Sequence, residues 1–103
     1  MTTRPAFDDV IHAPNRLRIC AALAAVTEAE FATLREALGV SDPVVSKHLR
    51  VLQEAGYVSL TKQSGGQGRA RTWVSLTRAG RRAFAAHVAE LQRLTGNAPP
   101  GPR

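Results

Sequence analysis

The sequence predicts a mainly α-helical α+β fold, and three observations support this prediction. The chain has 103 residues, which is the length of one domain, and 44% of them are hydrophobic. Two short amphipathic helical segments follow one another across a turn at 39–41. Two segments of alternating polarity and a long amphipathic segment come after them. The expected order over residues 6–94 is helix, helix, short strand, helix, helix, strand, strand, helix.

The first two expected helices lie on either side of Pro14. Residues 8–13 form a short helix that ends before this proline, because the residue preceding a proline avoids the helical region. Asn15 can cap a second helix over residues 16–26. This second helix carries apolar side chains on most of its faces, so we expect it in the middle of the core.

Two short helices follow, separated by a tight turn. Gly39 ends the first of them, since glycine readily adopts the left-handed conformation found after many helices. Ser41 or Asp42 can cap the second helix, and Pro43 suits its first turn. The expected bounds are 32–38 for the first helix and 41–55 for the second, with a minimal strand at 29–31 before them.

Two strands and one long helix complete the expected fold. Residues 57–62 and 71–76 alternate apolar and polar side chains and should pair as a hairpin around a glycine-rich loop. Thr77 can cap the helix that follows. The expected bounds are 57–76 for the hairpin and 77–94 for the helix, followed by a disordered tail at 96–103.

The helix expected at 41–55 has an apolar face and a polar face. At 3.6 residues per turn, its large apolar residues share one side and its basic residues lie opposite. Such a helix can pack on a core and still enter the major groove of DNA, although an ordinary solvated surface helix is the alternative. Lys47 and Arg50 suit phosphates or guanine edges, and Val44 suits a thymine methyl group. The inner face consists of Val45, Leu49 and Leu52, and the candidate DNA-binding residues are Ser41, Pro43, Val44, Ser46, Lys47, His48 and Arg50.

His48 lies at the edge of this inner face. We expect it to form a local hydrogen bond, and direct contact with a phosphate is the alternative.

The positive charge of the chain is localised. The formal net charge is +6, and residues 41–82 hold eight Lys and Arg against two Asp and Glu. This distribution is expected for a surface that faces a polyanion, and a purely solubilising charge is the alternative. The hairpin adds Lys62, Arg69 and Arg71 to the candidate DNA-binding residues, where they could contact phosphates or the minor groove.

Three segments carry a resemblance to a known family. Residues 40–58 (VSDPVVSKHLRVLQEAGYV) strongly resemble the recognition-helix segment of ArsR- and MarR-type winged-helix regulators. Residues 13–23 (APNRLRICAAL) and 75–81 (SLTRAGR) are similar to flanking motifs of these proteins. The likeness covers residues 6–94 and is greatest to a small stand-alone family related to MarR. It implies a winged helix-turn-helix fold and a homodimer that binds near-palindromic double-stranded DNA operators, usually as a repressor.

The first and last helices carry more apolar surface than one such unit needs. Pairing them across a two-fold axis would bury this surface and place two recognition helices about 34 Å apart, one turn of DNA. A small-molecule effector could bind between these helices and the rest of the unit, and its existence stays open. The candidate dimer residues are Phe7, Val10, Ile11, Phe84, Val88, Leu91 and Leu94.

Other activities have little support in the sequence. Cys20 is the single cysteine, expected to be buried, and His87-x-x-Glu90 matches half of a metal-sensing pattern of ArsR-type proteins, so we expect no metal and no cofactor. No catalytic arrangement is visible, and we expect no enzyme activity. No apolar run approaches the roughly 18 residues of a membrane span, which leads us to expect a cytoplasmic protein. A winged-helix module that binds proteins instead of DNA is the alternative function.

Overall fold

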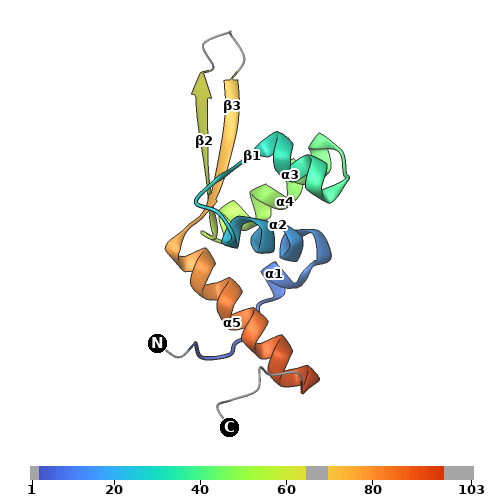
Figure 1. Cartoon of the computed structure of the whole chain (residues 1–103), viewed down its shortest axis with the longest axis vertical. Coiled ribbons are helices and arrows are strands. Elements are labelled where there is room, and N and C mark those ends of the chain that lie inside the picture. The colour runs from blue at the N-terminus through green and yellow to red at the C-terminus, as the bar shows by residue number, and fades with distance from the viewer. Residues whose placement is uncertain (1–2, 65–69, 97–103) are drawn as a thin grey trace.

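The computed structural model describes residues 3–64 and 70–96. In this part of the chain the mostly helical fold contains one small antiparallel sheet, as predicted, and the hairpin and α5 lie at opposite ends (Figure 1). The predicted order of elements is confirmed. The elements are α1 (Asp9–His12), α2 (Pro14–Ala24), β1 (Ala29–Glu30), α3 (Phe31–Leu38), α4 (Asp42–Glu54), β2 (Val58–Ser64), β3 (Ala70–Leu76) and α5 (Arg78–Thr95).

The sheet has three antiparallel strands in the order β1-β3-β2. Strand β1 is only two residues long, and Ala29 pairs with Val74 while Glu30 pairs with Trp73. Phe31, which we expected to end this strand, instead begins α3. In the hairpin the register runs from Val58 opposite Leu76 to Ser64 opposite Ala70.

The core lies between the helices and one face of the sheet. Val45, Leu49 and Leu52 on the inner side of α4 are each at most 1% exposed, so the predicted inner face of this helix is confirmed. None of the helices in the described part of the chain is long and apolar enough to cross a membrane. The buried hydrophobic side chains are Ile11, Ile19, Cys20, Leu23, Leu34, Leu38, Val45, Leu49, Leu52, Val58, Val74 and Leu76.

Helix α2 departs from the prediction in two ways. It begins at Pro14, with Ala13 at the N-cap position, and Asn15 does not cap it. The fixed backbone angle of a proline suits the first turn of a helix, so the same residue both ends α1 and begins α2. The side of α2 that carries Ala21 and Ala24 is exposed, and α2 is therefore buried on one face instead of most faces.

The turn between α3 and α4 is built as predicted at Gly39 but not at Ser41. Gly39 has a φ of +68°, in the left-handed region, and its N–H donates to the carbonyl of Arg35. Ser41 occupies the N-cap position of α4, yet its side chain makes no capping hydrogen bond. Instead, Arg35 forms an ion pair with Asp42 at 2.8 Å, which joins α3 to the first turn of α4.

The junction between α4 and α5 is closely packed around Thr77. Its Oγ1 accepts from the N–H of Gly80 at 3.0 Å, so the predicted cap is confirmed, and it also donates to the carbonyl of Gly56 at 2.6 Å. The N–H of Thr77 donates to the carbonyl of Tyr57. Gly80 faces the same carbonyl, and a Cβ at Gly80 would lie 2.1 Å from the Tyr57 oxygen. The start of α5 is thus fixed to the turn that ends α4.

Candidate nucleic-acid interface

The outward side of α4 is a polar and basic surface. Lys47 and Arg50 are exposed there, opposite the buried inner face, and Val44 is 36% exposed in the first turn. The helix can therefore be held by the core on one side and present small and basic side chains on the other. The exposed residues among the candidates on this helix are Ser41, Pro43, Val44, Ser46, Lys47 and Arg50.

His48 is half-buried and has a partner in α2. Its Nδ1 lies 3.3 Å from Nη1 of Arg16. A guanidinium has no acceptor, so Nδ1 accepts this hydrogen bond and the proton of the neutral ring lies on Nε2. Burial lowers the pKa of His48, and the charges of Arg16 and Lys47 lower it further. His48 thus has a hydrogen-bond partner within the fold, but this partner is Arg16 of α2, 32 residues away in the sequence, and not a local one.

The basic residues of the hairpin lie on different faces of it. Lys62 pairs with Thr72 and Arg71 pairs with Gln63, and both basic side chains are exposed. Successive residues of a strand point to opposite faces, so Lys62 is on the face that carries the buried Val74, while Arg71 is on the other. The hairpin therefore presents positive charge on both sides. Arg69, also a candidate, lies outside the described residues.

Several arginines that contribute to the positive charge are used inside the fold. Arg81 donates to the carbonyls of Ala24 and Val26, at the C-terminal end of α2. Arg18 similarly donates to the last carbonyls of α3. These carbonyls have no partners within their helices, so the arginines satisfy groups that the helices leave free. Arg81 keeps its positive charge in this arrangement, since its partners are neutral carbonyls, but the two hydrogen bonds fix the position of its guanidinium.

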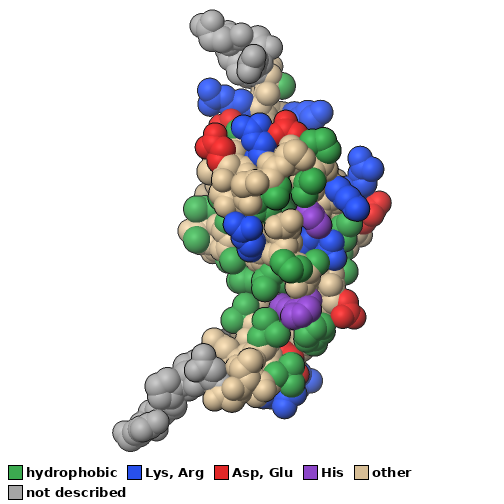
Figure 2. Space-filling model, turned by 90° about the vertical axis from the view of Figure 1, so that its right-hand side faces the viewer, with side chains coloured by type: hydrophobic (Ala, Val, Ile, Leu, Met, Phe, Trp, Pro, Cys, Tyr) green, Lys and Arg blue, Asp and Glu red, His purple; other side chains and the backbone are tan. Residues whose placement is uncertain are grey.

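A cluster of aromatic rings joins α1 to α5, and no pattern in the sequence indicates it. His87 of α5 is fully buried, and its Nε2 lies 3.2 Å from Nδ1 of His12. The ring of Phe7 packs against both imidazoles, with centroids 4.7 Å and 4.8 Å away. Figure 2 shows one histidine patch among hydrophobic side chains in the lower half of the molecule, and further histidine atoms higher up, close to Lys and Arg. In the sequence His87 is noticeable only as part of the His87-x-x-Glu90 pattern.

The tautomer of His87 follows from its two neighbours. The backbone N–H of Asp8 donates to Nδ1 at 3.0 Å, so Nδ1 carries no proton. Nε2 therefore carries it and donates to His12. Burial lowers the pKa of His87, the nearby His12 lowers it further, and the carboxylates of Asp8 and Asp9 act in the opposite direction with smaller effect.

We expect the free energy of unfolding to decrease below about pH 6.5. The pKa of His87 in the folded protein lies below its ordinary value of 6.5, so the unfolded chain binds the proton more readily. Stability is therefore greatest above this pH and falls as the pH drops toward the folded-state pKa. The pKa of His48 is also lowered in the folded protein, so protonation of His48 likewise decreases the free energy of unfolding as the pH drops. Urea unfolding between pH 5 and 8 measures the effect.

The His87→Asn variant is the control, because an amide oxygen can accept from Asp8 without titrating. It should show a smaller loss of stability with acid than the wild-type protein. Equal pH dependence in both proteins would contradict the role given to His87.

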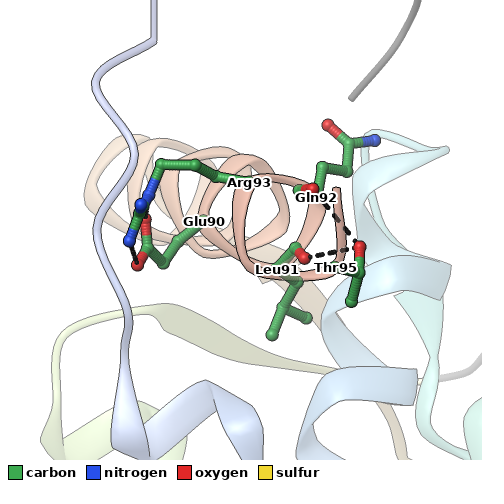
Figure 3. A network of polar contacts seen from close by, with 5 residues as sticks. All are labelled: Glu90, Leu91, Gln92, Arg93 and Thr95. Carbon is green, nitrogen blue, oxygen red and sulfur yellow. Dashed lines mark hydrogen bonds and ion pairs between the residues drawn. The ribbon is translucent and has the colours of Figure 1, made fainter. Parts of the chain in front are cut away.

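The two groups that suggested a metal or redox site have other roles. Both carboxylate oxygens of Glu90 contact Arg93 at 2.7 Å, and Figure 3 shows this pair on one side of α5 and the bonds of Thr95 to Leu91 and Gln92 on the other. Cys20 is buried, as expected, and burial raises the pKa of its thiol to about 11. Within residues 3–64 and 70–96, no three His, Cys, Asp or Glu side chains are grouped so that they could hold a metal ion.

The candidate dimer residues divide into exposed and buried ones. Phe7 and Leu94 are 46% and 58% exposed, and they lie on the N-terminal segment and at the end of α5. Val10, Phe84, Val88 and Leu91 are half-buried. Ile11, in contrast, is 0% exposed within one chain, so a second copy could not contact it. The inclusion of Ile11 was wrong because α1 turns this side chain into the core.

Comparisons with known proteins agree with this architecture. The sequence model of the family described as winged helix DNA-binding domain matches residues 15–95, and the chain belongs to this family. It is therefore a DNA-binding transcription regulator of the winged-helix class, with double-stranded DNA as the partner that this class implies.

Individual relatives cover most of the chain. An uncharacterized protein of Methanocaldococcus jannaschii, MJ0432, is 37% identical over 82 residues, which are 80% of this chain and 88% of the relative. A transcriptional regulator homologue of Pyrococcus horikoshii superposes with a TM-score of 0.79 at 25% identity, covering 84% of this chain and 85% of the other. HlyU of Vibrio cholerae has the same fold, with a TM-score of 0.60 at 21% identity over 82% of this chain and 83% of its own.

Proposed function

We propose that the protein is a dimeric, sequence-specific repressor that binds near-palindromic operators in double-stranded DNA. The observation that carries this proposal is the division of α4 into two faces. Val45, Leu49 and Leu52 hold it to the core, while Lys47 and Arg50 are exposed beside a hairpin with its own basic residues. In this arrangement α4 enters the major groove and the hairpin contacts phosphates or the minor groove.

Dimer formation follows from the apolar side chains that remain exposed on one chain. The N-terminal segment and the end of α5, which carry the exposed Phe7 and Leu94, lie at the opposite end of the molecule from the hairpin, so pairing there leaves the DNA-binding side free (Figure 1). Val10, Phe84, Val88 and Leu91 supply additional apolar area. A two-fold axis at this end would present two copies of α4 to successive turns of DNA. Such a regulator acts together with the DNA that it binds, and we therefore place it in the cytoplasm.

Lys47→Ala and Arg50→Ala should each weaken operator binding by about 1–3 kcal/mol if the side chain contacts a base. The operator is first selected from a random DNA pool, and binding is then measured by gel shift. Arg93→Ala is the matched control, since this exposed arginine lies on α5 and pairs with Glu90. It should bind as the wild-type protein does.

The salt dependence separates DNA binding from the alternative function. Each neutralised phosphate releases counterions, so the affinity should decrease steeply between about 50 and 200 mM salt. Failure to shift any duplex at the lower salt concentration would overturn the proposal and favour a module that binds proteins. Transcription from a promoter that overlaps the selected operator then distinguishes repression from activation.

A further inference from the structure

Residues 6–8, directly before α1, are attached to α5. The N–H of Ala6 donates to the carbonyl of Ala86 at 3.0 Å, and the N–H of Asp8 donates to Nδ1 of His87 at 3.0 Å. Phe7, between them, packs edge-on against the ring of His87. Two hydrogen bonds and one ring contact thus fix the backbone of residues 6–8 on α5.

The side chain of Asp8 reaches away from α5 to two other parts of the fold. Its Oδ1 accepts from the N–H groups of Val10 and Ile11, at 2.9 Å and 3.1 Å, and so caps α1. Its Oδ2 accepts from the phenol of Tyr57 at 2.5 Å. Asp8 therefore joins α5, α1 and the turn that follows α4. Hydrogen bonds to a carboxylate are stronger than those between neutral groups, and both Asp8 and Tyr57 are partly shielded from water.

Tyr57 is tightly linked to the recognition helix. Its N–H donates to the carbonyl of Leu52 in the last turn of α4, at 2.9 Å. Its own carbonyl accepts from Thr77 at the start of α5. The position of Tyr57 is therefore coupled to the position of the last turn of α4.

These contacts attach α5 to the DNA-reading unit at its start and again near its middle, and Arg81 adds hydrogen bonds to the carbonyls of Ala24 and Val26 close to the first of these points. The first is the start of α5, where Thr77 and Gly80 meet the Gly56–Tyr57 turn. The second is His87, ten residues along the helix, which at 1.5 Å per residue is about 15 Å away. One point of attachment would act as a hinge. The attachment of His87 to Asp8 restricts rotation of α5 about the contacts at its start.

We propose that Asp8 is a positioning residue that fixes the angle between α5 and the recognition helix α4. This inference rests on the proposed function, in which α5 lies at the dimer contact. In such a dimer the angle determines the distance between the two copies of α4. Asp8 thereby determines which spacing between operator half-sites the protein accepts, without touching DNA.

The test compares operators that differ only in spacing. One duplex carries the selected operator, others carry one or two base pairs inserted between its half-sites, and a further duplex carries a single half-site. The measured quantity is the ratio of the affinity for the selected spacing to the affinity for the changed spacing. A loss of folding or of base contacts would lower affinity for every duplex, whereas a positioning role changes this ratio.

Asp8→Ala and Tyr57→Phe should each reduce this ratio by about fivefold or more, as expected for the loss of a hydrogen bond that holds one of two orientations. Binding to the single half-site should stay unchanged. Asp8→Asn should restore the ratio, because its Oδ1 can cap α1 and its Nδ2 can donate to the phenol oxygen of Tyr57. Tyr57→Phe leaves the cap of α1 intact, so it decides the result if Asp8→Ala does not fold.

The outcomes separate this inference from the proposed function. If the wild-type protein prefers one spacing and the Asp8→Ala and Tyr57→Phe variants keep the same affinity ratio, the role of Asp8 is overturned. The proposed function is then unaffected. If the wild-type protein binds the single half-site as tightly as the full operator at every spacing, the proposed dimeric binding to two half-sites is overturned. The role of Asp8 is then overturned as well.

Discussion

Replacing Gly80 by alanine should destabilise the protein by about 1–3 kcal/mol, the usual cost of inserting a methyl group into a well-packed site. The ideal Cβ would lie 2.1 Å from the carbonyl oxygen of Tyr57 and 2.9 Å from its carbon. Both are backbone atoms, so the turn after α4 must move. Helix propensity alone predicts the opposite sign, because alanine is favoured over glycine by up to about 1 kcal/mol within a helix.

Thermal or urea unfolding of Gly80→Ala decides between these two effects. Ala79→Gly is the matched control, since Ala79 is the exposed neighbour on the same turn of α5. It should cost only the helix propensity of one residue, about 1 kcal/mol or less. A higher midpoint for Gly80→Ala than for the wild-type protein would show that the junction tolerates the methyl group and that our account of its packing is wrong.

Replacing Ile11 by alanine should lower the free energy of unfolding by about 2–5 kcal/mol, the usual range for truncating a fully buried isoleucine. Ile11 is 0% exposed within one chain and belongs to the same core cluster as the inner face of α4. The loss should be the same at every protein concentration, because a core contact within one chain does not depend on association.

Leu94→Ala is the matched control for Ile11→Ala. Leu94 is 58% exposed at the end of α5, so its truncation should have little effect on the stability of one chain. In the proposed dimer it should instead weaken self-association, which sedimentation over a range of concentrations measures. If the destabilisation by Ile11→Ala disappears at high protein concentration, Ile11 contributes to association and the core assignment is wrong.

The effects of these variants should differ because α5 has two roles in the fold. Its first turn, with Gly80, is packed into the unit that reads DNA, and its last turn, with Leu94, is exposed. Variants near the start of α5 should therefore change the stability of the unit. Variants near its end should change only what the helix contacts in another chain.

The amino-acid sequence by itself determined the elements and the two faces of α4. Val45, Leu49 and Leu52 recur at helical spacing, and this periodicity defines a buried side without reference to any other segment. Gly39 and Thr77 mark the end of α3 and the start of α5 through the local backbone and capping preferences of glycine and threonine. These signals act over three or four residues, which is why they can be recognised in the sequence.

Only the tertiary structure decided how distant side chains meet. His12 and His87 are 75 residues apart in the sequence, and packing of α1 on α5 brings Nδ1 of His12 to 3.2 Å from Nε2 of His87. The charge count includes Arg81, and only the structure shows that this exposed side chain also donates hydrogen bonds to the carbonyls of Ala24 and Val26. The sequence also placed Ile11 at a dimer contact, because periodicity shows that a side chain is apolar but not which apolar surface covers it. These contacts depend on the relative positions of whole elements, which no local preference encodes.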